Sequence, residues 1–173
     1  DAKIMLRGGK YSLPCELPAD KKIARLLGYY ASEGCISKGR DIIFSFGKHE
    51  DKLIKEVLEI LESLGLKPRL NHQAHGTQVM VSSKLLVCMF RALRAGGNAH
   101  EKRVPPVVFS MPKEAKLAFL HAYVNGDGCI YSREEEKPEW RPITHVYTTS
   151  VSGKLSNDLM LLYLQLGAFA GYT

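Results

Sequence analysis

Two acidic residues, Glu33 and Asp127, end two similar apolar segments, LLGYYASEGCIS over residues 26–37 and LHAYVNGDGCIY over residues 120–131. An acid in the last turn of a helix is unfavourable by roughly 0.3–1 kcal/mol, because this end carries partial negative charge. Two such acids side by side would also repel each other, and a cation between them would remove both penalties. Because oxygen ligands favour hard ions, the pair predicts a Mg²⁺ site at Glu33 and Asp127 that Mn²⁺ could also occupy.

An acid followed by glycine could simply end a helix, but the two segments belong to a longer internal repeat. Both continue with Gly-Cys-Ile, and LEILESLGLKPRL (58–70) also matches LMLLYLQLGAFAG (159–171). The first pair is offset by 94 residues, and the Leu-Gly shared by the second pair (64–65 and 166–167) is offset by 102. The extra eight residues fall in REEEKPEW (133–140), which we interpret as a longer hairpin loop in the second copy.

Hydrophobic periodicity predicts the elements of each copy. In the first, helices over about 20–33, 49–65 and 83–95 alternate with strand pairs over about 35–47 and 67–82. In the second, helices over about 113–126 and 151–166 enclose strands over about 128–133 and 143–149, and a further strand starts at 168–173. We expect an α+β fold of two pseudo-symmetric αββαββα halves, the second truncated.

The repeat divides the chain into a linker or arm (1–19), a first repeat (20–100), an inter-repeat linker (101–112) and an incomplete second repeat (113–173). Small residues at helical spacing predict that the two acidic helices pack closely: Gly28, Ala31, Ser32, Ala122 and Gly126. Pseudo-symmetry predicts a monomer, although the missing tail leaves domain swapping or a partner fragment open.

The formal net charge of +6 and the pI of about 9.1 favour a polyanionic partner such as nucleic acid. A non-nucleic-acid interaction domain, with charge serving only solubility, stays open. No apolar run reaches the roughly 18 residues that span a bilayer, and the N-terminus lacks a signal-peptide pattern. We therefore expect a cytoplasmic protein without membrane contact. The four cysteines lack zinc-site spacing and are predicted to be reduced, buried thiols.

The two acidic segments resemble the dodecapeptide motifs of the LAGLIDADG homing endonucleases, specifically the endonuclease domains of inteins. EKRVPPVVFSMP (101–112) is similar to the Lys-x-x-Pro segment before the second motif, and TTSVSGKLSNDLMLLYLQLG (148–167) to the block after the second hairpin. The resemblance covers about residues 20–172. It implies a saddle that binds double-stranded DNA and cuts both strands of a long site with Mg²⁺.

The resemblance also implies roles for individual residues. Glu33 and Asp127 would be the metal-binding catalytic acids, and Lys102 would lie near the scissile phosphates, with Lys154 as a loose counterpart in the second copy. His121 and Ala122 replace the usual small pair. Because Asp1 is not Cys or Ser and Thr173 is not Asn, this chain alone is not expected to splice.

Alternation along the strands predicts the residues that would read DNA from the concave face. They are Lys38, Arg40, Ser45, Arg69, Asn71, Gln73, Gln78, Tyr131, Arg133 and Arg141. His72 and His75 are expected to be solvated imidazoles of a turn rather than metal ligands. The alternative to an endonuclease is a catalytically inactive nucleic-acid-binding or RNA maturase-like protein of the same family.

Overall fold

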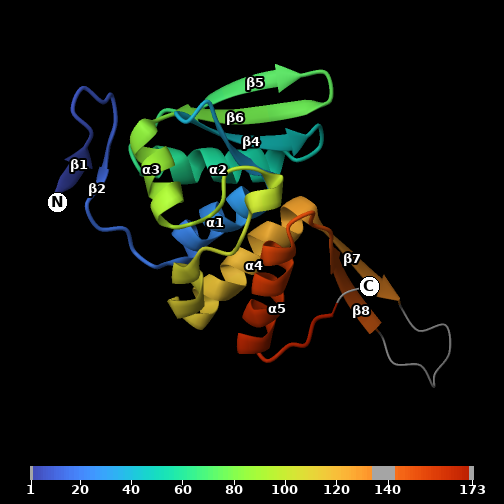
Figure 1. Cartoon of the computed structure of the whole chain (residues 1–173). Helices are drawn as coiled ribbons and strands as arrows, with labels where there is room; N and C mark the ends of the chain where they lie inside the picture. Colours follow the sequence, from blue (N-terminus) through green and yellow to red (C-terminus); the bar gives the residue numbers. More distant parts are fainter. Residues whose placement is uncertain (1, 134–142, 172–173) are drawn as a thin grey trace.

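Two helices, α1 (Lys21–Glu33) and α4 (Lys113–Asp127), lie side by side at the centre of the computed structural model, which describes residues 2–133 and 143–171 (Figure 1). A four-stranded sheet with helices α2 and α3 lies on one side of this pair. A two-stranded hairpin and helix α5 lie on the other side. The central helix pair therefore joins the two copies of the repeat.

The first copy has the predicted αββαββα order. Helix α1 is followed by β3 (Gly34–Ser37), β4 (Asp41–Gly47), α2 (Asp51–Ser63), β5 (Arg69–Gln73), β6 (Gly76–Ser82) and α3 (Lys84–Ala92). The strands pair antiparallel in the order β3-β4-β6-β5. Asp20 and Ser83 accept backbone hydrogen bonds at the starts of α1 and α3, which explains where these two helices begin.

The sheet buries one face. Ile42, Phe44 and Phe46 on β4 and Val79 and Val81 on β6 are at most 4% exposed and belong to the main core. The residues between them, such as Ser45 and Gln78, point to the opposite face, because side chains alternate along a strand. The sheet thus presents a polar outer face.

The second copy contains α4, β7 (Gly128–Arg133), β8 (Ile143–Thr148) and α5 (Gly153–Gln165). The predicted long loop at 133–140 lies almost wholly outside the described residues. The predicted strand start at 168–173 is wrong for residues 168–171, which form no strand. These residues follow a left-handed Gly167, and Phe169 is 94% exposed, so the segment makes no sheet ladder.

Glycine and alanine bring α1 and α4 into close contact, as predicted. A Cβ atom on Gly28 would overlap the carbonyl oxygen of Phe119 and lie 2.9 Å from the Cβ of Ala122. A Cβ atom on Gly126 would overlap the hydroxyl of Ser32. The backbones can therefore approach this closely only because both positions lack a side chain.

His121 lies outside this interface and is accommodated by a polar network. Its Nδ1 lies 2.9 Å from an Arg25 guanidinium nitrogen, and Arg25 also pairs with Glu56 of α2. Tyr29 completes the network by donating a 2.7 Å hydrogen bond to Glu56. The departure from small residues at position 121 thus adds a contact between the two copies without widening the helix pair.

The N-terminal segment expected as an arm carries a hairpin of β1 (Lys3–Met5) and β2 (Ser12–Pro14), and Leu13 anchors it in the core. The inter-repeat linker contains short 3₁₀ helices, η1 (Ala99–Glu101) ending at its start and η2 (Pro106–Ser110). Within the described residues, no helix is long and apolar enough to cross a membrane.

The prediction of buried cysteines is wrong. All four are free thiols, but Cys15, Cys88 and Cys129 are exposed and Cys35 is half-buried. Cys35 and Cys129 follow the helix-ending glycines on strands whose outer faces are open, so the shared Gly-Cys-Ile tripeptide buries neither thiol. They pack no core.

Candidate metal centre and nucleic-acid interface

The two predicted acids occupy equivalent positions, each as the last residue of its helix. Glu33 is followed directly by Gly34, the first residue of β3, and Asp127 by Gly128, the first residue of β7. Each glycine is extended, and its N–H donates to the carbonyl four residues earlier. Because a Cβ on either glycine would collide with the preceding helical turn, only glycine lets the chain pass so directly from helix to strand.

The helix pair brings these acids together. Glu33 Oε1 would lie 2.9 Å from a Cβ placed on Gly126, the neighbour of Asp127. Burial, followed by repulsion from Asp127 and Glu50, raises the pKa of Glu33 to about 7. Asp127 is more exposed, and partial desolvation together with Glu50 also raises its pKa. The site therefore holds more negative charge than the protein compensates.

Lys102 lies beside both acids. Its side chain is buried (4% exposed), its ammonium donates to the backbone carbonyls of Tyr30 and Gly34, and it sits 4.1 Å from the Tyr30 ring centroid. Burial lowers the pKa of Lys102 to about 8, while Glu33 and Asp127 act in the opposite direction. The ammonium of Lys102 thus offsets the partial negative charge of the carbonyls at the end of α1. Besides a cation bound between the two acids, this is a second reason why the helix end tolerates Glu33.

The linker that carries Lys102 is tied to the second copy. The hydroxyl of Ser152 donates a 2.7 Å hydrogen bond to the Lys102 carbonyl oxygen. The N–H of Val104 donates to Asp158, whose carboxylate also lies 3.2 Å from Arg103 Nε. These bonds fix the backbone of Lys102 between the end of α1 and the start of α5.

Lys154 is not the counterpart of Lys102. It is the second residue of α5 and is exposed, and Lys52 is the exposed second residue of the equivalent helix α2. Lys102 follows α3, and the second copy has no equivalent of α3 within the described residues. The sequence offset of 102 therefore relates Lys154 to Lys52.

Sequence reasoning missed Glu50. It precedes α2, its carboxylate accepts a 2.6 Å hydrogen bond from the Gly47 N–H, and its charge raises the pKa of both Glu33 and Asp127. The equivalent residue before α5 is Ser152. An acid between a strand and a helix was the available signal, but it resembles an ordinary helix start.

The donor set fits a hard divalent cation. Glu33 and Asp127 offer carboxylate oxygens, and a cation would offset the burial and the like-charge repulsion that raise the pKa of both groups. The described residues contain no group of three or more His, Cys, Asp or Glu arranged to hold a metal. Two carboxylates without a full protein cage suit Mg²⁺, which commonly keeps waters and takes substrate phosphate oxygens as its other ligands.

The predicted reading residues of the first copy share the outer face of the sheet. The Asn71 amide donates to Gln78 at 3.2 Å, and Gln78 donates to Ser45 at 3.5 Å. Arg69 and Gln73 alternate in step with Asn71 on β5. Lys38 and Arg40 are exposed in the turn between β3 and β4, where Lys38 and Gly39 both adopt left-handed conformations. The structure thus brings the strand residues of this set together on one face, with Lys38 and Arg40 in a turn at its edge.

The second copy is less completely described. Tyr131 is 53% exposed and lies opposite His145 in the β7–β8 ladder, and His145 stacks on Tyr147. Only the backbone of Arg133, the last residue of β7, is described, and Arg141 lies outside the described residues. His72 and His75 of the first copy are exposed as predicted, although His72 belongs to β5 and bonds Thr77 rather than lying in the turn.

The raised pKa of Glu33 predicts a pH-dependent stability in the absence of metal. Because folding raises this pKa from 4.5 to about 7, the contribution of protonated Glu33 is complete below pH 4.5 and is lost as the pH rises through about 7. One pKa unit corresponds to about 1.4 kcal/mol, so the loss between pH 5 and pH 8 is at most about 3 kcal/mol.

Chemical denaturation in EDTA at several pH values measures this effect. Glu33→Gln removes it, so the difference in unfolding free energy between variant and parent should grow in favour of the variant from pH 5 to pH 8. Glu59→Gln, at an exposed position of α2, is the matched control. Identical pH profiles for Glu33→Gln and the parent would contradict the crowding of the two acids.

The chain is similar to known proteins over nearly its whole length. Residues 20–95 match the family described as the LAGLIDADG-like domain. An uncharacterized protein of Methanocaldococcus jannaschii is 35% identical over 170 residues, or 92% of this chain and 18% of that protein. The DNA polymerase II large subunit of Thermococcus kodakarensis is 30% identical over 159 residues, or 88% of this chain and 8% of the subunit. The chain thus spans less than a fifth of either relative.

Among solved structures, the crystal structure of I-DmoI in complex with DNA and Mn is similar with a TM-score of 0.47 and 16% sequence identity. The similarity covers 65% of this chain and 64% of that chain.

Proposed function

Because residues 20–95 form a LAGLIDADG-like domain, we propose that this chain is a homing endonuclease domain that cuts both strands of a long DNA site. The observation that carries the proposal is the pair of acids at equivalent helix ends, close enough that repulsion contributes to the raised pKa of Glu33. The proposed division is a first repeat over 20–100, a linker over 101–112 and a second repeat from 113.

Glu33 and Asp127 would hold Mg²⁺, or Mn²⁺ in its place, with water and phosphate oxygens as the remaining ligands. When bound, the metal would lower the pKa of an attacking water and stabilise the leaving oxygen of the phosphodiester. Lys102 acts as a positioning residue, because its ammonium holds the end of α1 in place and adds positive charge beside both carboxylates.

The outer face of the sheet would read the DNA. Arginine can bond guanine in the major groove, and asparagine or glutamine can bond adenine, which gives Arg69, Asn71 and Gln78 base-reading chemistry. The exposed Lys38 and Arg40 in the β3–β4 turn suit phosphate contacts. In the second copy, Tyr131, Arg133 and Arg141 would have the same task.

We propose that the domain is intein-associated. Its homologous segment makes up only 8% of an archaeal DNA polymerase subunit. A compact unit that occupies a small part of a much longer and differently named protein is expected of an inserted mobile element.

A plasmid library of archaeal genomic fragments, including DNA polymerase genes that lack the homologous segment, tests the endonuclease proposal. Incubation with the protein and Mg²⁺ should linearise a small subset of plasmids, and sequencing of the new ends should give one long shared site. EDTA should abolish the cuts. Salt-dependent DNA binding without any linearised plasmid would instead favour the inactive, binding-only alternative.

A further inference from the structure

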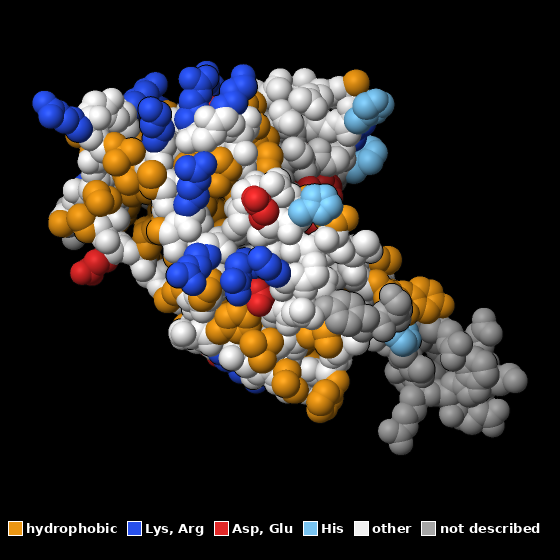
Figure 2. Space-filling model, in the orientation of Figure 1, with side chains coloured by type: hydrophobic (Ala, Val, Ile, Leu, Met, Phe, Trp, Pro, Cys, Tyr) orange, Lys and Arg blue, Asp and Glu red, His pale blue; other side chains and the backbone are white. Residues whose placement is uncertain are grey.

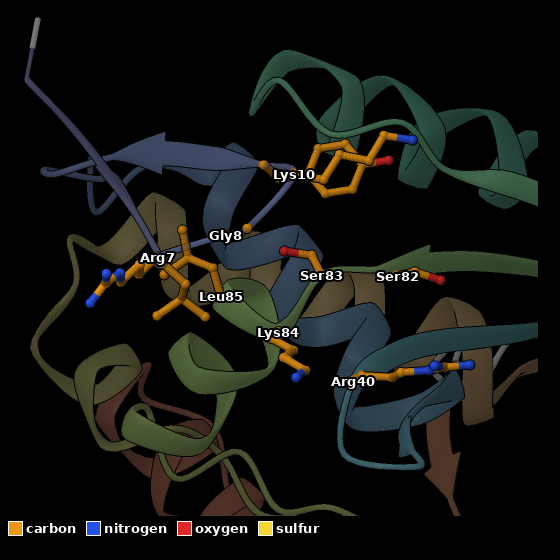
Figure 3. Close-up of a pocket in the computed structure, with 11 residues that line it drawn as sticks. Arg7, Gly8, Lys10, Arg40, Ser82, Ser83, Lys84 and Leu85 are labelled. Carbon is orange, nitrogen blue, oxygen red and sulfur yellow. The ribbon is translucent and has the colours of Figure 1, made fainter.

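A pocket of about 320 Å³ lies between the loop that joins β1 to β2 and the first turn of α3 (Figure 3). Four basic residues line it: Arg7, Lys10, Arg40 and Lys84, here called the basic strip. Arg7 and Lys10 come from the hairpin loop, Arg40 from the β3–β4 turn and Lys84 from the start of α3. Three segments far apart in the sequence therefore contribute positive charge to one surface.

The charges of the basic strip are mostly uncompensated. Arg40 pairs with the buried Asp41 at 3.3 Å. Within the described parts of the chain, no ion pair involves Arg7, Lys10 or Lys84, and Lys10 only faces the Tyr11 ring at 5.7 Å. Unpaired cations grouped on one surface create a potential that attracts a polyanion.

The arrangement fits a row of phosphates better than a single small anion. In Figure 3, Arg7 and Arg40 extend to opposite ends of the labelled group, with Ser82, Ser83 and Lys84 between them. The Ser83 hydroxyl is used by the backbone of α3, where it accepts from the Leu86 N–H at 3.2 Å. Cations spaced along a strip can meet successive phosphates of a nucleic-acid backbone, whereas a single phosphate needs donors aimed at one point.

The basic strip is continuous with the outer face of the sheet. Arg69, on that face, donates a 3.3 Å hydrogen bond to the hydroxyl of Ser82, which lines the pocket. Figure 2 shows lysine and arginine side chains gathered along the edge of the molecule that holds the hairpin and the sheet. A duplex lying on the sheet face could therefore run on over the strip.

The hairpin loop is held in place. Leu13 is buried, the N–H of Gly9 donates to the Leu6 carbonyl oxygen at 2.8 Å, and Gly8 adopts a left-handed conformation. Arg7 and Lys10 are thus presented from a fixed loop, so that binding them to a ligand costs less ordering than binding a flexible arm.

We propose that the basic strip binds the sugar-phosphate backbone of the same DNA that the sheet face contacts, which makes the β1–β2 hairpin a part of the DNA interface. The inference rests on the proposed function, because it takes the polyanion to be duplex DNA. It assigns a role to Arg7 and Lys10, which precede the first repeat, and to Lys84, which begins α3 at the edge of the sheet.

Salt-dependent binding of a 30-base-pair duplex tests the proposal in EDTA, where cleavage is absent. The variant Arg7→Gln/Lys84→Gln should make the slope of log K, the association constant, against log salt less steep by about 1.8, since each phosphate contact contributes about 0.9. The control Lys113→Gln/Lys116→Gln removes the same charge at the start of α4 and should leave the slope within about 0.3 of the parent value. Arg7→Lys/Lys84→Arg keeps the charge and should restore it.

The outcomes separate the two proposals. If the parent shows no salt-dependent DNA binding, the proposed function fails and the strip loses its ligand. If the parent binds but Arg7→Gln/Lys84→Gln has the slope of the control variant, only the basic strip is overturned. Thermal unfolding of each variant identifies any loss of DNA binding that is caused by misfolding. If the double variant misfolds, Lys10→Gln alone tests the basic strip, with an expected slope change of about 0.9.

Discussion

Glu33→Gln and Asp127→Asn are each expected to lower Mg²⁺-dependent DNA cleavage by about 100-fold to 1,000-fold while DNA affinity falls by no more than about 3-fold. An amide keeps the shape of the carboxylic side chain but loses the negative charge that would hold the cation. Because each acid belongs to one copy, loss of either should impair cutting of both strands if the ion is shared between them.

The measurement pairs cleavage in Mg²⁺ with DNA affinity in EDTA for each variant. Glu59→Gln, at an exposed position of α2, loses the same charge from a residue that does not act on the pKa of Glu33 or Asp127, and it is the matched control. The removal of negative charge beside the phosphates should, if anything, strengthen DNA binding. Cleavage that survives in both variants, or affinity that falls as far as cleavage, would contradict the role proposed for these acids.

The local elements and the pairing of the two acids could be predicted from sequence because the signals are short-range or repeated. The Gly-Cys-Ile tripeptide after each acid fixed the alignment of the copies, and small residues such as Gly28 and Gly126 indicated the contact between their helices. Alternation along β4 to β6 placed Ser45, Asn71 and Gln78 on one face, as the hydrogen bonds between them confirm.

The features that sequence reasoning missed depend on contacts between distant segments. Glu50 faces the acids only because α2 begins beside the end of α1. Lys102 was named from the sequence, but its burial was not, because the carbonyls that it contacts belong to residues about 70 positions earlier. The basic strip draws on three segments with no shared pattern. Lys154 was misassigned because residue type was matched without the element order that relates it to Lys52.

Gly28→Ala is expected to destabilise the protein by about 1–3 kcal/mol, and Gly28→Leu by enough to prevent folding. Alanine is the better helix former by about 1 kcal/mol, so propensity alone would stabilise α1. Against this, the new Cβ would overlap the Phe119 carbonyl oxygen and press on Ala122, and backbone atoms cannot rotate away as a flexible side chain can. The helices must then move apart.

Chemical denaturation compares Gly28→Ala with Gly153→Ala, a helical glycine at the start of α5 whose added Cβ would meet nothing within 4 Å. The control should be neutral or slightly stabilising, so a Gly28→Ala protein as stable as the parent would contradict the close approach of α1 and α4.

The Gly28→Ala variant also tests the acid pair. Because separated helices relax the repulsion between Glu33 and Asp127, the pKa of Glu33 should fall from about 7 toward its ordinary value. The pH-dependent stability loss of the metal-free protein should then shrink in Gly28→Ala, which would link the packing of two small residues to the charge of the site.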